Sequence, residues 1–239
     1  MTQIVLHKAD SRGQANHGWL NSFHTFSFAN YYNPERIHFG ALRVLNDDTV
    51  SAGMGFGKHP HDNMEIISIP LEGDLQHQDS MGNIATIKHG DIQVMSAGTG
   101  IQHSEYNASK TDLVKFLQIW VFPKTRNVTP RYDQITLNVV DRQNKLQQIL
   151  SPNADDEGVW IHQDAWFHLG TFEENRQTTY NLHKSGNGVY AFVLKGSFEI
   201  AGHFLGTRDG LGIWETENFK LQATSNEAEI LLMEVPMEL

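Results

Sequence analysis

Two histidines separated by one residue, His59 and His61, are the first feature of the sequence that could do chemistry. Residues i and i+2 of a strand project from the same face, so both imidazoles could bind one metal ion. The pair is weak evidence by itself, because a chain of 239 residues with 13 histidines contains such a pair by chance about as often as not. The residues around the pair therefore decide whether it is a site.

The residues around the pair follow regular spacings. Residues 53–73 follow the pattern G-x5-H-x-H-x3-E-x7-G, in which Glu65 is the acidic member. Residues 90–107 follow G-x7-G-x-G-x2-H-x3-N, which contains His103. Glu105 stands two residues after His103, so two neighbouring strands could each direct two ligands into one barrel. The sequence thus predicts four ligands that converge from two strands.

The elements that position these residues are predicted to be strands. Short apolar runs alternate with glycines and turn residues at intervals of about ten residues, which is typical of an all-β sandwich or barrel. Helical periodicity is nearly absent. The best candidate for a helix, residues 141–150, fits a connector equally well.

The chain also contains an internal repeat. In residues 69–95 and again in residues 192–214, an apolar strand ends in a glycine turn, a hairpin follows, and another glycine opens a second apolar strand. A duplicated β-barrel explains this order of elements. We therefore predict an N-terminal domain over 1–133, a linker region over 134–158 and a C-terminal domain over 159–239.

Composition excludes several classes of site. Cysteine is absent, so disulfides, thiolate ligands, iron–sulfur clusters and cysteine nucleophiles are excluded, and a metal ion would be bound by nitrogen and oxygen alone. Acidic residues number 28 against 18 basic ones, and the net charge of -10 would repel a nucleic acid backbone.

Membrane association is not expected either. No apolar run is long enough to span a bilayer, and charged residues interrupt the apolar start of the chain, which argues against a secretory signal. We expect a soluble, cytoplasmic protein with no membrane or direct nucleic acid partner.

The paired motifs resemble those of the cupin superfamily. Within it, the chain resembles pirin and the bacterial pirin-like quercetinases, and the C-terminal half is similar in layout more than in detail. The likeness is specific in the N-terminal half, where it rests on residues 18–32, 55–61, 78–83 and 96–105.

This resemblance implies a bicupin, which consists of two tandem antiparallel β-barrels of the jelly-roll type with little helix. It also implies a metal ion in the N-terminal barrel, bound by His59, His61, His103 and Glu105. Many cupins take their carboxylate from the position of Glu65, which is the reserve candidate. The C-terminal copy has no H-x-H pair, so that barrel is expected to be metal-free.

Three neutral imidazoles and one carboxylate would leave a divalent ion with a net charge of +1 and with positions open to water or substrate. Ligands of this type suit Fe(II), Mn(II), Co(II), Ni(II), Cu(II) and Zn(II), and they do not select one of these. The resemblance to pirin favours one Fe(II) ion per chain.

The resemblance further implies a metal-dependent dioxygenase of the quercetin 2,3-dioxygenase type. It would open the heterocycle of a flavonol such as quercetin with release of carbon monoxide, and Glu105 could take the proton of the 3-hydroxyl group as general base. The partners would be a small aromatic substrate and dioxygen. Two alternatives stay open: a non-enzymatic, metal-dependent module that binds a protein partner, as the pirin coregulators do, and a cupin enzyme for another small aromatic or sugar.

Other polar residues are interpreted as structural. Asp47 and Asp48 are expected in a solvated turn. Five histidines lack a partner at ligand spacing and are expected at the surface: His77, His89, His162, His168 and His183.

Overall fold

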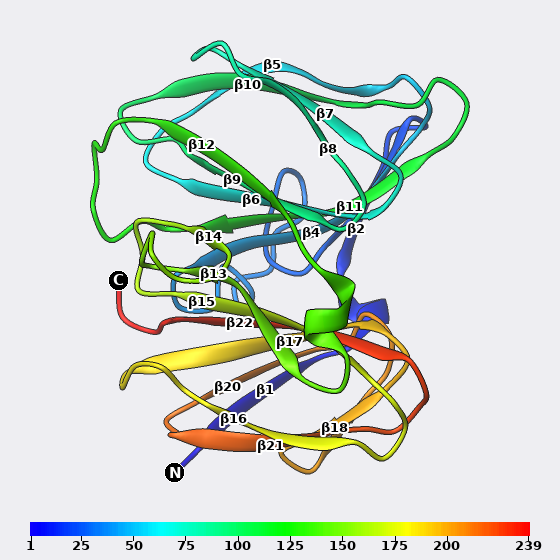
Figure 1. The fold of residues 1–239 in the computed structure, drawn as a ribbon, viewed down its shortest axis with the longest axis vertical. Coiled ribbons are helices and arrows are strands. Elements are labelled where there is room, and N and C mark those ends of the chain that lie inside the picture. Colours follow the sequence, from blue (N-terminus) through cyan, green and yellow to red (C-terminus); the bar gives the residue numbers. More distant parts are fainter.

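The computed structural model describes all 239 residues as four stacked β-sheets, two for each half of the chain. Figure 1 shows the order of the layers: a small sheet, two large sheets in the middle and a second small sheet. The predicted all-β bicupin fold is confirmed. Each domain is a sandwich of two open sheets rather than a closed barrel.

The first domain pairs a seven-stranded sheet with a four-stranded one. The large sheet has the order β12 (Arg131–Thr136), β9 (Asp91–Ser96), β6 (Glu65–Glu72), β11 (Val114–Val121), β4 (Leu42–Val50), β3 (Leu20–His24) and β2 (Gly13–Asn16). The small sheet has the order β5 (Gly55–His61), β10 (Ile101–Asn107), β7 (Leu75–Asp79) and β8 (Ile84–Ile87).

The second domain repeats this arrangement. Its large sheet has the order β1 (Gln3–His7), β20 (Gly210–Trp214), β17 (Asn187–Lys195), β22 (Ala228–Pro236), β15 (Trp166–Phe172), β13 (Leu146–Ser151) and β14 (Val159–Trp160). Its small sheet has the order β16 (Gln177–Asn181), β21 (Asn218–Ala223), β18 (Phe198–Ile200) and β19 (His203–Leu205). The strands pair antiparallel throughout, apart from the parallel pair β13 and β14.

The two strand orders match position by position. The central order β9-β6-β11-β4 corresponds to β20-β17-β22-β15, and the small sheets correspond in the same way, as the glycine spacing indicates. The predicted boundaries at 133 and 159 stay a prediction, and several strand pairings cross them. Strand β1, from residues 1–133, pairs with β20, and β13, from residues 134–158, pairs with β15.

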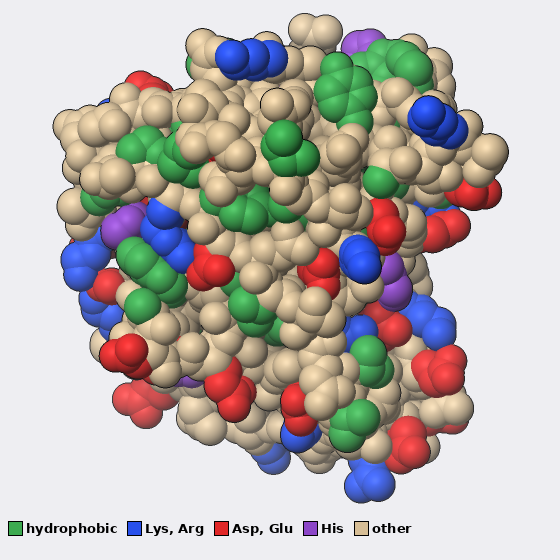
Figure 2. All heavy atoms as spheres, turned by 45° about the horizontal axis from the view of Figure 1, so that its top comes forward, with side chains coloured by type: hydrophobic (Ala, Val, Ile, Leu, Met, Phe, Trp, Pro, Cys, Tyr) green, Lys and Arg blue, Asp and Glu red, His purple; other side chains and the backbone are tan.

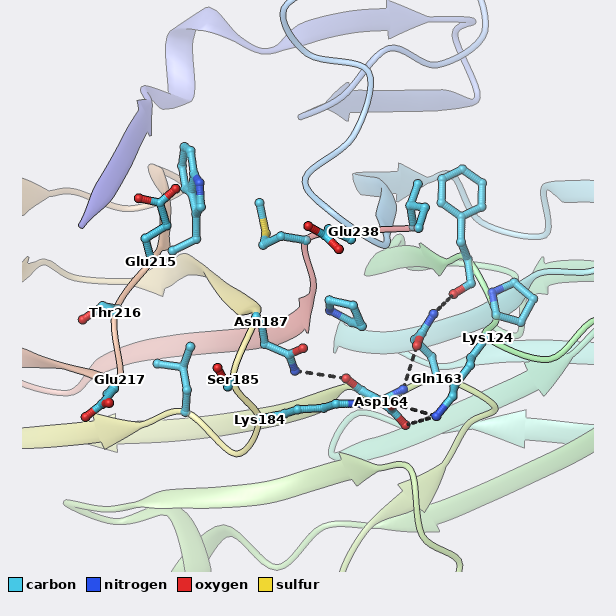
Figure 3. Close-up of a pocket in the computed structure, with 18 of the residues that line it drawn as sticks. Lys124, Gln163, Asp164, Lys184, Ser185, Asn187, Glu215, Thr216, Glu217 and Glu238 are labelled. Atoms are coloured by element: carbon cyan, nitrogen blue, oxygen red, sulfur yellow. Dashed lines mark hydrogen bonds and ion pairs between the residues drawn. The ribbon is translucent and has the colours of Figure 1, made fainter. Parts of the chain in front are cut away.

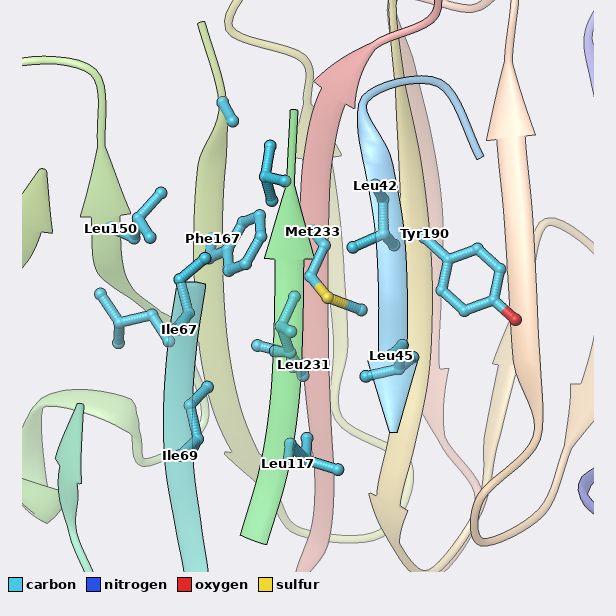
Figure 4. Packing of buried hydrophobic residues seen from close by; sticks show 14 of the residues in the cluster. Leu42, Leu45, Ile67, Ile69, Leu117, Leu150, Phe167, Tyr190, Leu231 and Met233 are labelled. Atoms are coloured by element: carbon cyan, nitrogen blue, oxygen red, sulfur yellow. The ribbon is translucent and has the colours of Figure 1, made fainter. Parts of the chain in front are cut away.

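The two large sheets pack face to face and share one apolar core. Figure 4 shows side chains of both sheets in contact across this layer, and the cluster includes Leu45 and Ile67 of the first domain with Phe167 and Leu231 of the second. Because both faces of these sheets are covered, strands β6 and β17 at their centres are buried in nearly every position.

Two neighbouring aspartates of the first domain have different roles, and one of them links the two domains. The prediction that Asp47 and Asp48 form a solvated turn is wrong, because both lie in β4. Asp47 accepts hydrogen bonds from Arg12 Nη1 at 3.2 Å and, from the other domain, from Arg208 Nε at 2.8 Å. Asp48 points to the opposite face and is buried, and burial raises its pKa to about 7. Tertiary partners here outweigh the local preference of aspartate for turns.

The surface carries charges of both signs. On the face shown in Figure 2, acidic and basic side chains are interspersed, and no continuous basic band crosses it. The helices are two 3₁₀ segments, η1 (Ala9–Ser11) and η2 (Val139–Arg142), and neither is long enough to cross a membrane. Residues 141–150, the best helix candidate in the sequence, contain the end of η2 and most of strand β13.

Substitution Leu231→Ala tests whether the shared core makes the two domains unfold together. Leu231 is fully buried between the large sheets, so its truncation should lower the free energy of unfolding by about 2–5 kcal/mol. Chemical denaturation followed by tryptophan fluorescence and circular dichroism should still give one transition, displaced to lower denaturant. Ile84→Ala, at a side chain that is 69% exposed, is the control. Two separated transitions would show that the domains are independent.

Candidate metal centre

Three histidines meet on the inner face of the first domain's small sheet. Strands β5 and β10 are antiparallel neighbours, and their register places His59 opposite His103 and His61 opposite Ile101. The ring centroids of His59 and His103 lie 4.4 Å apart, and His61 lies 4.9 Å from each of the other two. One nitrogen of each ring lies within 4.8 Å of the others. The predicted convergence of these three side chains is present.

The ring nitrogens of His59 and His103 are in hydrogen-bonding states that fit metal binding. The Nδ1 of His59 lies 2.8 Å from the carbonyl oxygen of Gly57, so it carries the proton and leaves Nε2 as a free lone pair. His103 is 1% exposed, and neither of its ring nitrogens has a hydrogen-bond partner in the protein. A buried, unpartnered imidazole is costly, and a bound cation would remove that cost.

Burial also keeps two of the rings neutral. It lowers the pKa of His61 to about 4, and the neighbouring His103 and His59 contribute to this shift. Burial likewise lowers the pKa of His103 to about 3, again with a contribution from His59. Both rings are therefore uncharged at neutral pH, and one nitrogen of each offers the lone pair that binds a metal ion.

Glu105 lies beside His103, deeper in the domain. Its carboxylate is 3% exposed, and Gln118 Nε2 donates to both oxygens, at 3.1 and 3.0 Å. Ser68 Oγ donates to one of them at 3.2 Å. A carboxylate oxygen of Glu105 lies within 4.8 Å of ring nitrogens of His103 and His77, and it does not fall in the group formed with His59 and His61.

The reserve candidate, Glu65, lies elsewhere. It precedes Ser68 by three residues on β6, so the two side chains project from opposite faces of the strand. Ser96 Oγ donates to its carboxylate at 2.6 Å, and burial raises its pKa to about 7. Glu65 belongs to neither group of potential ligands.

His77 is the residue that sequence reasoning missed. The expectation that it lies at the surface is wrong, since it is fully buried, and the same expectation is wrong for His168, which is 7% exposed. His77 faces Glu105 across the β7–β10 pair, and its ring lies 5.3 Å from that of His103. The alternation Leu75-His77-Asp79 on one strand was the available signal, because it places all three on one face.

A pocket of about 750 Å³ opens beside His61, which is the member of the histidine cluster that lines it. This volume is in the range of small-molecule binding sites. Trp120 forms one wall, with its ring 4.9 Å from His61 in an edge-to-face arrangement. Further lining residues are Pro60, Met64, Ser80, Ile101 and Gln102.

A larger hollow of about 1500 Å³ lies between the two domains. Figure 3 shows Lys124 of the first domain and Lys184 of the second directed at Asp164, and Asn187 Nδ2 donates to the Asp164 carbonyl at 3.1 Å. Lys124 and Lys184 both pair with Asp164 in this hollow, and no group of potential metal ligands lies there. The smaller pocket is therefore the candidate site.

Comparison with known proteins identifies the family. Residues 5–121 match the family model described as Pirin, and residues 148–235 match the one described as Quercetinase C-terminal cupin domain. A protein named quercetin 2,3-dioxygenase from Escherichia coli K12 is 46% identical over 233 residues, which cover 98% of this chain and 99% of that protein. The chain belongs to the pirin family.

Other pirins are similar to this chain over nearly its whole length. A pirin-like protein from Caulobacter vibrioides is 39% identical and is matched over 94% of this chain and 96% of its own. The crystal structure of the bacterial pirin YhhW from Escherichia coli in complex with nickel(II) is 45% identical, with a TM-score of 0.92 over 98% of this chain and 99% of that one.

The second domain of this pirin has a different interior. Strands β16, β21 and β18 correspond to β5, β10 and β7 of the first domain. Their pairing places Tyr180, Phe219 and Leu221 where the first domain has His59, His103 and Glu105. All three belong to a buried apolar cluster of 16 residues. The absence of a metal ion from this domain stays a prediction, and the replacement of these three proposed ligands by side chains without imidazole or carboxylate argues in its favour.

Titration of the histidine rings in metal-free protein tests the buried cluster. Because the pKa values of His61 and His103 are lowered to about 4 and about 3, their imidazole NMR signals should keep the neutral form down to about pH 5. A histidine in an unstructured peptide titrates at about 6.5 and serves as the reference. A midpoint near that value for either ring would mean that water surrounds it, against the burial described above.

Proposed function

We propose that this pirin is a metal-dependent dioxygenase that opens the heterocycle of a flavonol such as quercetin and releases carbon monoxide. The observation that carries the proposal is the meeting of His59, His61 and the unpartnered, buried His103 beside a pocket of about 750 Å³. Relatives at 46% identity that are named quercetin 2,3-dioxygenase support the substrate class.

We further propose that His59, His61, His103 and Glu105 hold one divalent ion. Glu105 is the carboxylate nearest to His103 in the group of potential ligands, and Glu65 projects from the wrong face. Imidazole and carboxylate suit Fe(II), which the family resemblance favours, and also Ni(II), which the related pirin structure contains. When bound, a divalent ion would polarise a substrate oxygen and make its proton more acidic.

Glu105 is proposed as the general base. Gln118 and Ser68 hold its carboxylate in one orientation, and their neutral donors leave it free to accept the proton of the flavonol 3-hydroxyl group. Trp120 and Met64 give the pocket apolar walls that would orient the flat rings of the substrate and exclude water.

Substitution His61→Ala tests the metal site. Loss of one imidazole should reduce the metal content from about one ion per chain to near zero, and flavonol consumption should stop with it. Elemental analysis and the loss of flavonol absorbance in air are the measurements, and His89→Ala, at an exposed histidine of the same domain, is the control. Retention of a full complement of metal by His61→Ala would rule out this ligand set.

Substitution Glu105→Gln tests the base. It removes the proton acceptor at nearly constant volume, so kcat for flavonol should fall by about 10²–10⁴ as measured by oxygen consumption. The metal content of each sample is measured together with kcat, because Glu105 is also a proposed ligand and loss of the metal ion would lower kcat as well. Glu72→Gln, at an exposed carboxylate paired with Lys115, should leave kcat unchanged. Activity within threefold of the original would assign the base to another group.

A further inference from the structure

A carboxylate behind the metal centre is held by its own turn. The Oδ1 of Asp79 accepts from the backbone N–H groups of Met81 and Asn83, at 2.9 and 3.1 Å, and Oδ2 accepts from Asn83 Nδ2 at 2.8 Å. Burial alone raises the pKa of Asp79, but the hydrogen bonds from Asn83, His77 and Met81 outweigh this and leave the pKa below its ordinary value. Asp79 is therefore an ionised carboxylate that can only accept hydrogen bonds.

This carboxylate determines which nitrogen of His77 carries the proton. The Nε2 of His77 lies 3.3 Å from Asp79 Oδ2, so Nε2 is the donor. In the neutral ring, Nδ1 is then an acceptor. That Nδ1 is buried and has no hydrogen-bond partner in the protein.

His103 has the complementary requirement. If one of its nitrogens binds the ion, the other carries a proton and needs an acceptor, as nearly all metal-binding histidines do. Glu105 already receives hydrogen bonds from Gln118 and Ser68, whereas His77 Nδ1 receives none. One ring nitrogen of His77 lies within 4.8 Å of one ring nitrogen of His103, and a hydrogen bond between the two rings requires a rotation about the broad terminal torsion of either ring.

We infer that Asp79 and His77 are positioning residues of the metal centre: His77 accepts the hydrogen bond of the His103 nitrogen that does not bind the ion, and Asp79 fixes the tautomer that makes this possible. The inference rests on the proposed role of His103 as a ligand. It assigns a function to a buried histidine that contributes no ligand to the proposed set.

The competing explanation is that His77 only fills space in the core, because its ring also packs 4.8 Å from the ring of Tyr132. Substitution His77→Phe separates the two, since it keeps a flat ring in the same space and removes both nitrogens. Substitution His77→Gln keeps an acceptor, and its carbonyl oxygen should restore the hydrogen bond in part. His89→Phe, at an exposed position, is the matched control.

Two readouts are needed, and neither requires substrate. Ni(II) affinity, measured by competition with a chelator, should fall about 10–100-fold in His77→Phe and by less in His77→Gln. In Cu(II)-loaded protein, pulsed EPR detects the remote nitrogens of the bound imidazoles, whose quadrupole coupling depends on hydrogen bonding. One of these signals should shift in His77→Phe, whereas the number of coordinated imidazoles should stay the same.

Three outcomes would overturn the inference. Unchanged affinity and unchanged remote-nitrogen signals in a folded His77→Phe would mean that His77 only fills space, and His77→Leu, which also removes both ring nitrogens, gives the same test if the phenylalanine variant does not fold. Loss of one coordinated imidazole would make His77 a ligand. Failure of the original protein to bind Ni(II) or Cu(II) would instead refute the proposed metal site itself.

Discussion

The register between β5 and β10 is the constraint on which the site depends. Side chains alternate between the two faces of a strand, so a slip of one residue would turn His59 and His61 away from His103. The register changes between His103 and Glu105, where β5 contains one extra residue. This bulge bends the strand just before the histidines, and within it the carbonyl of Gly57 orients the His59 ring. A local irregularity of the backbone thus fixes the tautomer of a proposed ligand.

Polar groups are distributed very unequally between the two copies of the fold. The buried side-chain atoms without a partner in the protein number 11, and all but one of them, Gln147 Oε1, belong to the first domain. Such groups cost free energy that must be recovered elsewhere. The second domain and the shared layer contain the two largest apolar clusters, of 16 and 26 residues. The costly unpartnered groups are thus concentrated in the domain that contains the candidate site, and the other domain has the more apolar interior.

The sequence predicted the fold class and the three histidines because both depend on local patterns. Glycine-bounded alternation indicates strands, and the H-x-H spacing places His59 and His61 on one face whatever the tertiary structure. The burial of His77 and Asp48 could not be predicted in this way, because alternation shows which residues share a face and not whether another sheet covers that face. The pairing of β1 with β20 was equally inaccessible, because it joins residues from opposite ends of the chain.

That last pairing has a consequence for biosynthesis. Strand β1 leaves the ribosome well before β20, the strand whose edge it completes. Until β20 has been made, the backbone donors and acceptors of β1 lack this partner and stay open to wrong ones. The large sheet of the second domain therefore cannot be completed until the chain on both sides of the first domain has been made.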